Sequence, residues 1–214
     1  PTSIKGFNDD PFSIIVPENV ENVILQELIL TSYGKIEATN NKQQIVIEVK
    51  NLTTELNSSP TLTNMNVNGP FNIIQSSSVK LEENVTLNDA DIKYQIDLMN
   101  SSSKPIFNGN TSTYPKTISI NVPAIDERIN MAVSNVTIFR GTFDCDKWIE
   151  ALGNNFPSKF YEKPKSCSPV STQSASLLES ETIELILKGK AHEPEQPKEK
   201  SNKLSGGAIA GIVI

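Results

Sequence analysis

Short apolar segments that alternate with polar residues constrain the fold of this chain more than any other feature. In residues 42–49, Ile45, Ile47 and Val49 recur at every second position. Successive side chains on a β-strand point to opposite faces, so this period is typical of a half-buried strand. The sequence therefore predicts an all-β protein. Further strands are predicted at residues 13–16, 22–30, 71–74, 79–81, 85–87, 92–98, 117–122 and 183–187, with a pair of strands inside residues 132–143.

The segments between these strands are rich in asparagine, serine and threonine. Such residues favour turns because their short side chains hydrogen-bond to the local backbone. Asn68-Gly69-Pro70 is a strong turn signal, and Asn108-Gly109 is another. Loops are therefore predicted over residues 1–12, 50–69, 101–113 and 154–176.

One segment reads as a helix. Asp144 can cap the residues that follow it, and Trp148, Ile149 and Leu152 share one helical face. Gly153 supplies a C-terminal stop. The sequence predicts about two helical turns here.

A weak internal sequence repeat suggests stacked coils. Residues 21–25 (ENVIL), 83–87 (ENVTL) and 134–138 (SNVTI) resemble one another. Their spacing fits multiples of a coil of roughly 20 to 26 residues, which is the length that a β-solenoid repeats. The asparagine before each segment would lie at a turn and stack on its counterparts. Because residues 34–74 show no clear repeat, a β-sandwich is the alternative fold.

Two stretches carry a resemblance to known surface proteins. Residues 134–143 (SNVTIFRGTF) resemble a coil of the right-handed parallel β-helix proteins found on the surfaces of protists and bacteria. Residues 206–214 (GGAIAGIVI) resemble the start of the membrane span in protist type I surface proteins. This resemblance implies a repetitive ectodomain used in adhesion, with no fixed catalytic set. The expected fold is thus a right-handed parallel β-helix, or solenoid, with one short helix near its C-terminal end.

The C-terminal residues predict attachment to a membrane. A charged, proline-containing run from residue 189 cannot bury a core, so residues 189–205 are expected to be a disordered stalk. Residues 206–214 are small and apolar, and a spanning helix needs about 20 such residues. We therefore expect a truncated transmembrane helix that continues beyond Ile214. The all-β ectodomain would occupy residues 1–188.

Cys145 and Cys167 are the two cysteines of the chain. In an oxidising compartment they would form a disulfide worth roughly 3 kcal/mol on the chain-entropy model. Their α-carbons should then lie about 4.4 to 6.8 Å apart. Two unrelated buried thiols are the other interpretation.

Six Asn-x-Ser/Thr sequons favour an extracellular glycoprotein. The expected location is the cell surface or a secretory-pathway membrane, in type I orientation. Glycosylation at the two asparagines in the repeated segments, Asn84 and Asn135, is expected to be weaker, because stacked turn residues are partly covered. The six acceptor residues are Asn51, Asn57, Asn84, Asn100, Asn110 and Asn135.

The residue inventory argues against several chemistries. The single histidine, His192, lies in the predicted stalk, which excludes a Ser-His-Asp triad and a histidine-rich metal site from the folded part. The net charge is -6 and there are two arginines, so nucleic-acid binding is not expected. No catalytic residue, metal site or cofactor is predicted.

Two carboxylate pairs could still carry chemistry. Asp89 and Asp91, or Asp144 and Asp146, could bind Ca²⁺ or act as acid and base on a glycan. An enzyme would also need Lys93 or Arg140 close to such a pair. Solvated turn carboxylates are the simpler interpretation.

Together these patterns predict a non-enzymatic extracellular domain of a single-pass membrane glycoprotein, used in adhesion or surface recognition. Its partners would be the membrane, through the C-terminal span, and a glycan or protein ligand. The alternatives are a carbohydrate-active lyase or hydrolase built on a β-helix, and a stalked surface sensor.

Overall fold

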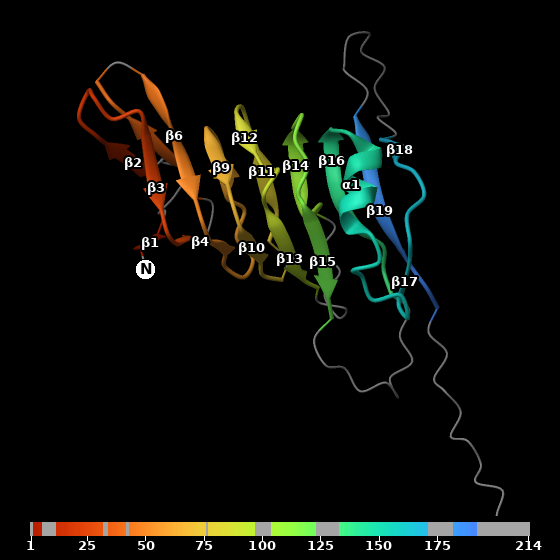
Figure 1. Ribbon diagram of the computed structural model, residues 1–214. Helices are drawn as coiled ribbons and strands as arrows, with labels where there is room; N and C mark the ends of the chain where they lie inside the picture. The colour runs from red at the N-terminus through yellow and green to blue at the C-terminus, as the bar shows by residue number, and fades with distance from the viewer. Residues whose placement is uncertain are drawn as a thin grey trace, which may run out of the picture.

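The computed structural model describes residues 2–5, 12–31, 34–41, 43–75, 77–96, 104–122, 133–170 and 182–191. Within these ranges the chain forms nineteen strands and one helix, α1 (Cys145–Leu152). Figure 1 shows the strands following one another across the molecule in the order of the sequence. The predicted all-β class is confirmed.

The first sheet has six parallel strands. Residues that pair on neighbouring strands are 19 to 26 positions apart in the sequence. One such series of paired residues is Leu28, Leu52, Phe71, Ile92 and Ile118. In sheet order the strands are β1 (Thr2–Lys5), β4 (Leu28–Thr31), β7 (Leu52–Thr54), β10 (Pro70–Ile73), β13 (Asp91–Gln95) and β15 (Thr117–Asn121).

The second and third sheets take the strands between those of the first. The second sheet contains β8 (Thr61–Leu62), β11 (Val79–Leu81), β14 (Phe107–Asn110), β16 (Val136–Thr142), β19 (Ile183–Gly189) and β17 (Tyr161–Glu162), with β18 (Ser168–Pro169) beside β19. The third sheet contains β12 (Val85–Thr86), β9 (Met65–Val67), β6 (Gln44–Val49), β5 (Ile36–Thr39) and β2 (Phe12–Ile15), with β3 (Asn22–Leu25) paired to β6.

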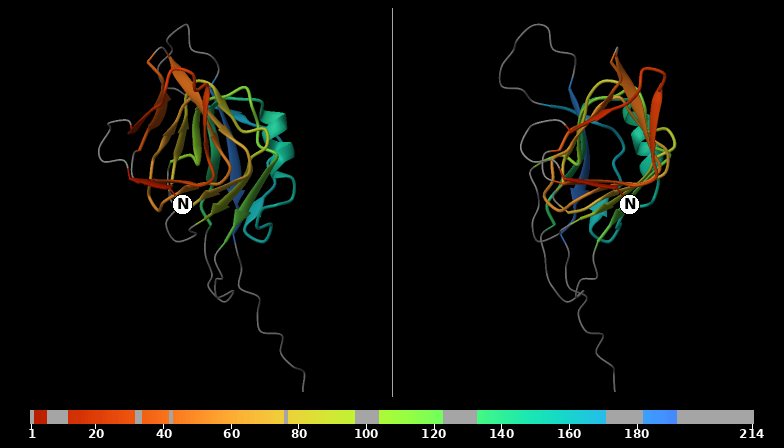
Figure 2. Two further views of the ribbon diagram at one scale, coloured as in Figure 1. Left: turned by 60° about the vertical axis from the view of Figure 1, so that its left-hand side comes forward. Right: turned by 90° about the vertical axis from the view of Figure 1, so that its left-hand side faces the viewer.

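The chain visits the three sheets in turn. From β7 it passes to β8 and β9, returns to the first sheet at β10, and continues through β11 and β12 to β13. Viewed from the N-terminal side, the strands surround a common interior (Figure 2).

Not all of the pairing is parallel. β5 and β6 pair antiparallel, as do β16 and β19. β17 and β18 both run antiparallel to β19. The second and third sheets are therefore mixed, with most of the antiparallel pairs gathered at the C-terminal end of the molecule.

Stacked apolar side chains fill the interior. In the first sheet, from β4 to β15, alternate residues of each strand point inward and meet the equivalent residue of the next strand. Burying each such leucine, isoleucine or phenylalanine contributes about 1.5 to 3 kcal/mol. The two inward columns are Leu28, Leu52, Phe71, Ile92 and Ile118, and Leu30, Thr54, Ile73, Tyr94 and Ile120.

The predicted helix is confirmed at its expected bounds. The Asp144 side chain accepts a hydrogen bond from the Lys147 backbone N–H at 3.2 Å, and Gly153 follows the last turn with φ +52°. Trp148 is fully buried, with its ring 5.4 Å from that of Phe107 and 4.7 Å from that of Phe139. Its indole N–H donates to the Thr113 carbonyl at 3.3 Å. The helix thus closes the core beyond β12, the last described strand of the third sheet.

Cys145 and Cys167 form a disulfide, as predicted. Their α-carbons lie 6.0 Å apart, inside the expected window. The bond joins the first residue of α1 to the residue before β18. It therefore ties the helix to the segment that covers β19.

Several element predictions were wrong. Residues 22–30 form two strands, β3 and β4, because the chain turns between sheets at Gln26 and Glu27. Residues 132–143 contain one long strand, β16, rather than a pair. The predicted loop at 50–69 holds β7, β8 and β9. Further strands lie where loops were predicted: β1, β14, β17 and β18.

The repeated asparagine segments are explained in part. Val23 pairs with Ile47, Ile47 with Met65, and Met65 with Val85. Asn22 and Asn84, which precede Val23 and Val85, therefore occupy equivalent positions in the third sheet. Asn135 precedes β16 in the second sheet, so the third segment is not equivalent to the other two.

Some predictions fall outside the described residues. These concern Asn100, His192, most of the stalk at 189–205, and residues 206–214. No helix in the described ranges is long and apolar enough to cross a bilayer.

Candidate binding groove

A groove of about 980 Å³ lies on the outside of the molecule, along the corner between the second and third sheets. One wall comes from β11, β14 and the residues that follow β14. The other comes from β6, β9 and β12. Most of its lining is polar, with amides from Gln44, Asn66, Asn84 and Asn110, and hydroxyls from Thr63, Thr86, Thr111, Ser112 and Thr113.

An amide ladder runs along the edge of the groove. The Asn84 side-chain N–H donates to the Asn64 side-chain oxygen at 2.8 Å. Asn64 in turn donates to the Gln44 side-chain oxygen at 2.5 Å. Asn64 and Asn84 have φ values of +46° and +57°, a backbone region that asparagine tolerates better than most residues. The three amides thus lie in line at the starts of β6, β9 and β12, which are neighbouring strands of the third sheet.

The opposite rim is held by threonine hydroxyls. The Thr113 hydroxyl donates to the Val85 carbonyl at 3.2 Å and accepts from the Leu87 N–H at 3.2 Å. The Thr111 and Thr113 hydroxyl oxygens are 3.1 Å apart. These bonds fix residues 111–113 against β12, so this wall is ordered without a ligand.

The charges in the groove largely neutralise one another. Lys35 lies 3.2 Å from Glu82, and Lys80 lies 2.9 Å from the same carboxylate. The pKa of Lys35 is raised, chiefly by its hydrogen bond to Glu37. The pKa of Glu82 is lowered, chiefly by its hydrogen bond to Lys80. Glu82 is therefore held as an anion and is a poor proton donor at neutral pH.

The carboxylates singled out from the sequence do not line this groove. Asp91 begins β13, where its carboxylate accepts from the Thr117 hydroxyl at 2.8 Å, while Asp89 is exposed in the preceding turn. Asp144 caps α1. Among the described residues there is no group of three or more His, Cys, Asp and Glu side chains that could hold a metal ion.

The two basic residues proposed as catalytic neighbours lie on different sheets. Lys93 is on β13, whereas Arg140 is on β16 and forms an ion pair with Glu184. Lys93 shares the outward face of β13 with Asp91, whereas Arg140 is on another sheet, so the two basic residues do not converge on one carboxylate pair.

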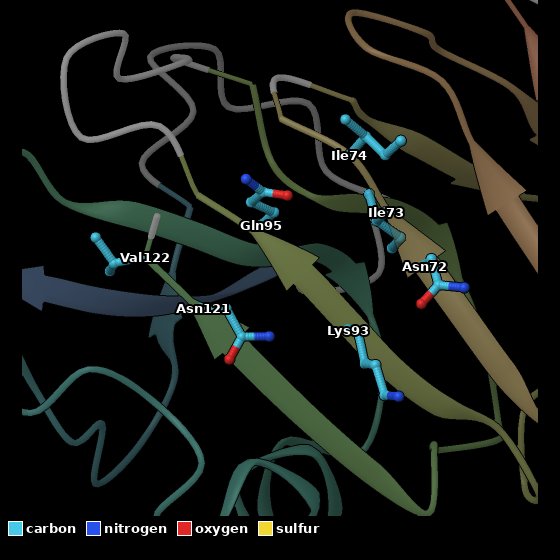
Figure 3. A pocket seen from close by; sticks show the side chains of 7 residues that line it. All are labelled: Asn72, Ile73, Ile74, Lys93, Gln95, Asn121 and Val122. Carbon is cyan, nitrogen blue, oxygen red and sulfur yellow. The ribbon is translucent and has the colours of Figure 1, made fainter. Parts of the chain in front are cut away.

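A second, smaller hollow of about 310 Å³ lies on the outer face of the first sheet. Figure 3 shows Asn72, Lys93, Gln95 and Asn121 beside it, on three adjacent strands. The Asn72 side-chain N–H also donates to the Asn51 side-chain oxygen at 3.4 Å. This face therefore carries one cation among amides.

Five sequon asparagines lie in the described ranges. Asn57, Asn84, Asn110 and Asn135 are exposed, and Asn51 is half-buried beside Asn72. Asn135 accepts a hydrogen bond from the Gly189 N–H at 3.0 Å. Asn84 and Asn110 both line the groove, so a glycan on either would enter it.

Comparisons with protein-family models, curated proteins and solved structures yield no match to this chain. The groove is therefore interpreted from its own chemistry.

Sequence reasoning missed the groove, although one signal was present. Gln44, Asn64 and Asn84 are spaced at 20-residue intervals. The interval equals the 20-residue offset between β9 and β12 and is close to the 18-residue offset between β6 and β9, but the surrounding asparagines hide it.

Proposed function

We propose that this chain is the recognition domain of a cell-surface glycoprotein, and that its groove binds a neutral glycan. Its parallel strands would wind as a right-handed β-helix that presents the groove on a rigid wall. The recurrence of equivalent residues about every 20 positions in all three sheets supports this winding over a β-sandwich, whose strands pair mainly antiparallel.

The observation that carries the proposal is the array of amides and hydroxyls in the groove. Amide and hydroxyl groups both donate and accept hydrogen bonds, as the hydroxyls of a sugar do. Because the lysines and glutamates pair within the groove, a neutral ligand meets little net charge. The described residues that line this groove include no aromatic ring, so each site is expected to bind weakly and to gain strength through multivalent display.

The disulfide and the sequons support the location. Disulfides persist in oxidising compartments, which is where N-glycosylation also occurs. The stalk at residues 189–205 and a span beginning at 206–214 would then hold the domain away from the membrane. The carbohydrate-active enzyme is less favoured, because Glu82 is held ionised between two lysines.

The test uses the full chain secreted from a eukaryotic host. Treatment with a glycosidase should lower its mass. An array of immobilised neutral glycans should retain the wild-type protein when it is presented as a multimer. Gln44→Ala with Asn66→Ala removes two groove side chains from the third sheet, keeps every sequon, and should reduce retention about tenfold, in line with two lost hydrogen bonds.

The matched control is Ser119→Ala with Asn121→Ala, on β15 of the first sheet. It should leave retention unchanged. Loss of binding in this control but not in the groove variant would move the site to the outer face of the first sheet. Hydrolysis or elimination of a bound glycan would favour the enzyme.

A further inference from the structure

The segment between β17 and β18 leaves a gap along β19. Glu162 pairs with Lys188, and Ser168 pairs with Glu184, so the chain joins β19 on both sides of the gap. Between these two pairs, the segment has five residues, 163–167, whereas β19 has only three, 185–187. The two additional residues make the segment bow away from the strand.

The bowed segment encloses a pocket of about 290 Å³. Lys163 and Lys165 lie on the segment, and Lys188 lies across from them on β19. Ile186 belongs to the lining between them, and the hydroxyl residues Ser166 and Ser168 complete one side. The pocket therefore combines positive charge, hydroxyl donors and a small apolar surface.

The local charge is opposite to that of the whole chain. Three lysines and one glutamate, Glu162, line the pocket, whereas the chain carries a net charge of -6. In the part of the chain that the structure describes, no carboxylate pairs with Lys165 or Lys188. Lys163 donates to the Asn154 side-chain oxygen at 3.4 Å, a neutral partner that leaves its charge uncompensated.

The pocket is held open by the fold. Both ends of the bowed segment are hydrogen-bonded to β19, and Pro164 within it is buried. The disulfide from Cys167 to Cys145 anchors one end to α1. The Lys190 N–H donates to the Phe160 carbonyl at 2.8 Å near the other end. Binding of a ligand would therefore not require the entropy loss of ordering this segment.

We propose that this pocket binds the sulfate or carboxylate groups of an acidic polysaccharide. Lysine ammonium groups attract such anions as point charges, and the serine hydroxyls can bond to sugar oxygens. The recessed position favours a chain-like ligand that enters the pocket over a flat anionic bilayer. The site is separate from the polar groove and does not depend on it.

The probe is a sulfated decasaccharide of heparin type, bound by the full chain at several salt concentrations. Lys165→Gln with Lys188→Gln should weaken binding at least tenfold at physiological salt. It should also lower the slope of log Kd against log salt by between one and two. Each lysine that is replaced is one ammonium fewer to displace a counterion from the polysaccharide. The control, Lys93→Gln with Lys116→Gln, makes the same charge change on the first-sheet side and should change affinity less than twofold.

Near-UV circular dichroism of both variants should match the wild type. Equal weakening by the two variants would mean that net charge alone drives binding, and it would overturn the proposal. No binding by the wild type would do the same. Vesicles with anionic lipid form the second arm: binding to vesicles but not to the decasaccharide would assign the lysines to a membrane surface instead. The neutral-glycan array reports on the groove independently, so either proposal can fail alone.

Discussion

At the scale of single residues, Thr54 is an exception in an otherwise apolar column. It lies between Leu30 and Ile73 on neighbouring strands. Its hydroxyl is buried and has no hydrogen-bond partner in the described structure. A buried hydroxyl without a partner costs free energy that a methyl group of the same size does not.

Thr54→Val is therefore expected to raise the free energy of unfolding by about 1 kcal/mol. Urea denaturation followed by far-UV circular dichroism measures the change. Thr53→Val is the control, because Thr53 points outward and accepts a hydrogen bond from the Asn72 side chain at 3.5 Å. A Thr54→Val variant less stable than the wild type would show that the hydroxyl has a partner in solution.

Tyr161 predicts how stability depends on alkaline pH. Burial raises the pKa of its phenol far above the usual value, and the nearby Tyr94 raises it further. The folded chain thus keeps this phenol neutral, while the unfolded chain ionises it near pH 10. The stabilisation is complete below pH 10 and is lost as pH rises above that value.

The free energy of unfolding should consequently fall above pH 10, with Tyr161 contributing about 1.4 kcal/mol per pH unit. Tyr161→Phe should remove this part of the slope, measured by urea denaturation between pH 8 and 11.5. Tyr114→Phe, at an exposed position, should leave the slope as it is. If both variants keep the wild-type slope, other groups control alkaline unfolding.

At the scale of elements, a close approach of two strands depends on glycine. Gly109 on β14 and Gly141 on β16 pair in register, with φ values of +117° and +150°. A Cβ added at Gly141 would lie 1.7 Å from the Gly109 carbonyl oxygen, which belongs to the backbone and cannot move aside. Only glycine fits at this contact.

Gly141→Ala is expected to cost more than 3 kcal/mol or to prevent folding, judged by soluble yield and by urea denaturation. Gly153→Ala is the comparison, because a Cβ there meets only the Glu150 carbonyl at 3.6 Å. The open space at Gly153 leaves only the backbone strain of φ +52° and ψ −120°, so the loss should be about 1 to 3 kcal/mol. Similar losses in the two variants would mean that β14 and β16 separate easily.

The elements also show why some of the fold was predictable and some was not. β6 and β15 were predicted because isoleucine alternates over several residues, and α1 because its cap and stop are local signals. β8 and β17 have two residues each, too few for any period. They exist because neighbouring strands pair with them. The groove was hidden for the same reason, since its residues meet only through stacking.

At the scale of the whole molecule, the two ends of the stack differ. The C-terminal end is covered: α1 closes the core, the Ile120 N–H donates to the Asn155 carbonyl at 2.8 Å, and β17 and β18 flank β19. The described strands nearest the N-terminus include exposed apolar residues, with Ile15 77% and Ile24 53% exposed. Unfolding is therefore expected to begin at the N-terminal rungs, which hydrogen exchange by residue would reveal as the least protected strands.

The position of β19 also sets the mechanical character of the domain. This strand is held on one side by β16 and on the other by β17 and β18, and the chain leaves it at Gly189. A pull on the following residues, directed along the strand, would load these hydrogen bonds in shear and share the force among them. A domain pulled in this way would resist unfolding better than one whose last strand separates one hydrogen bond at a time.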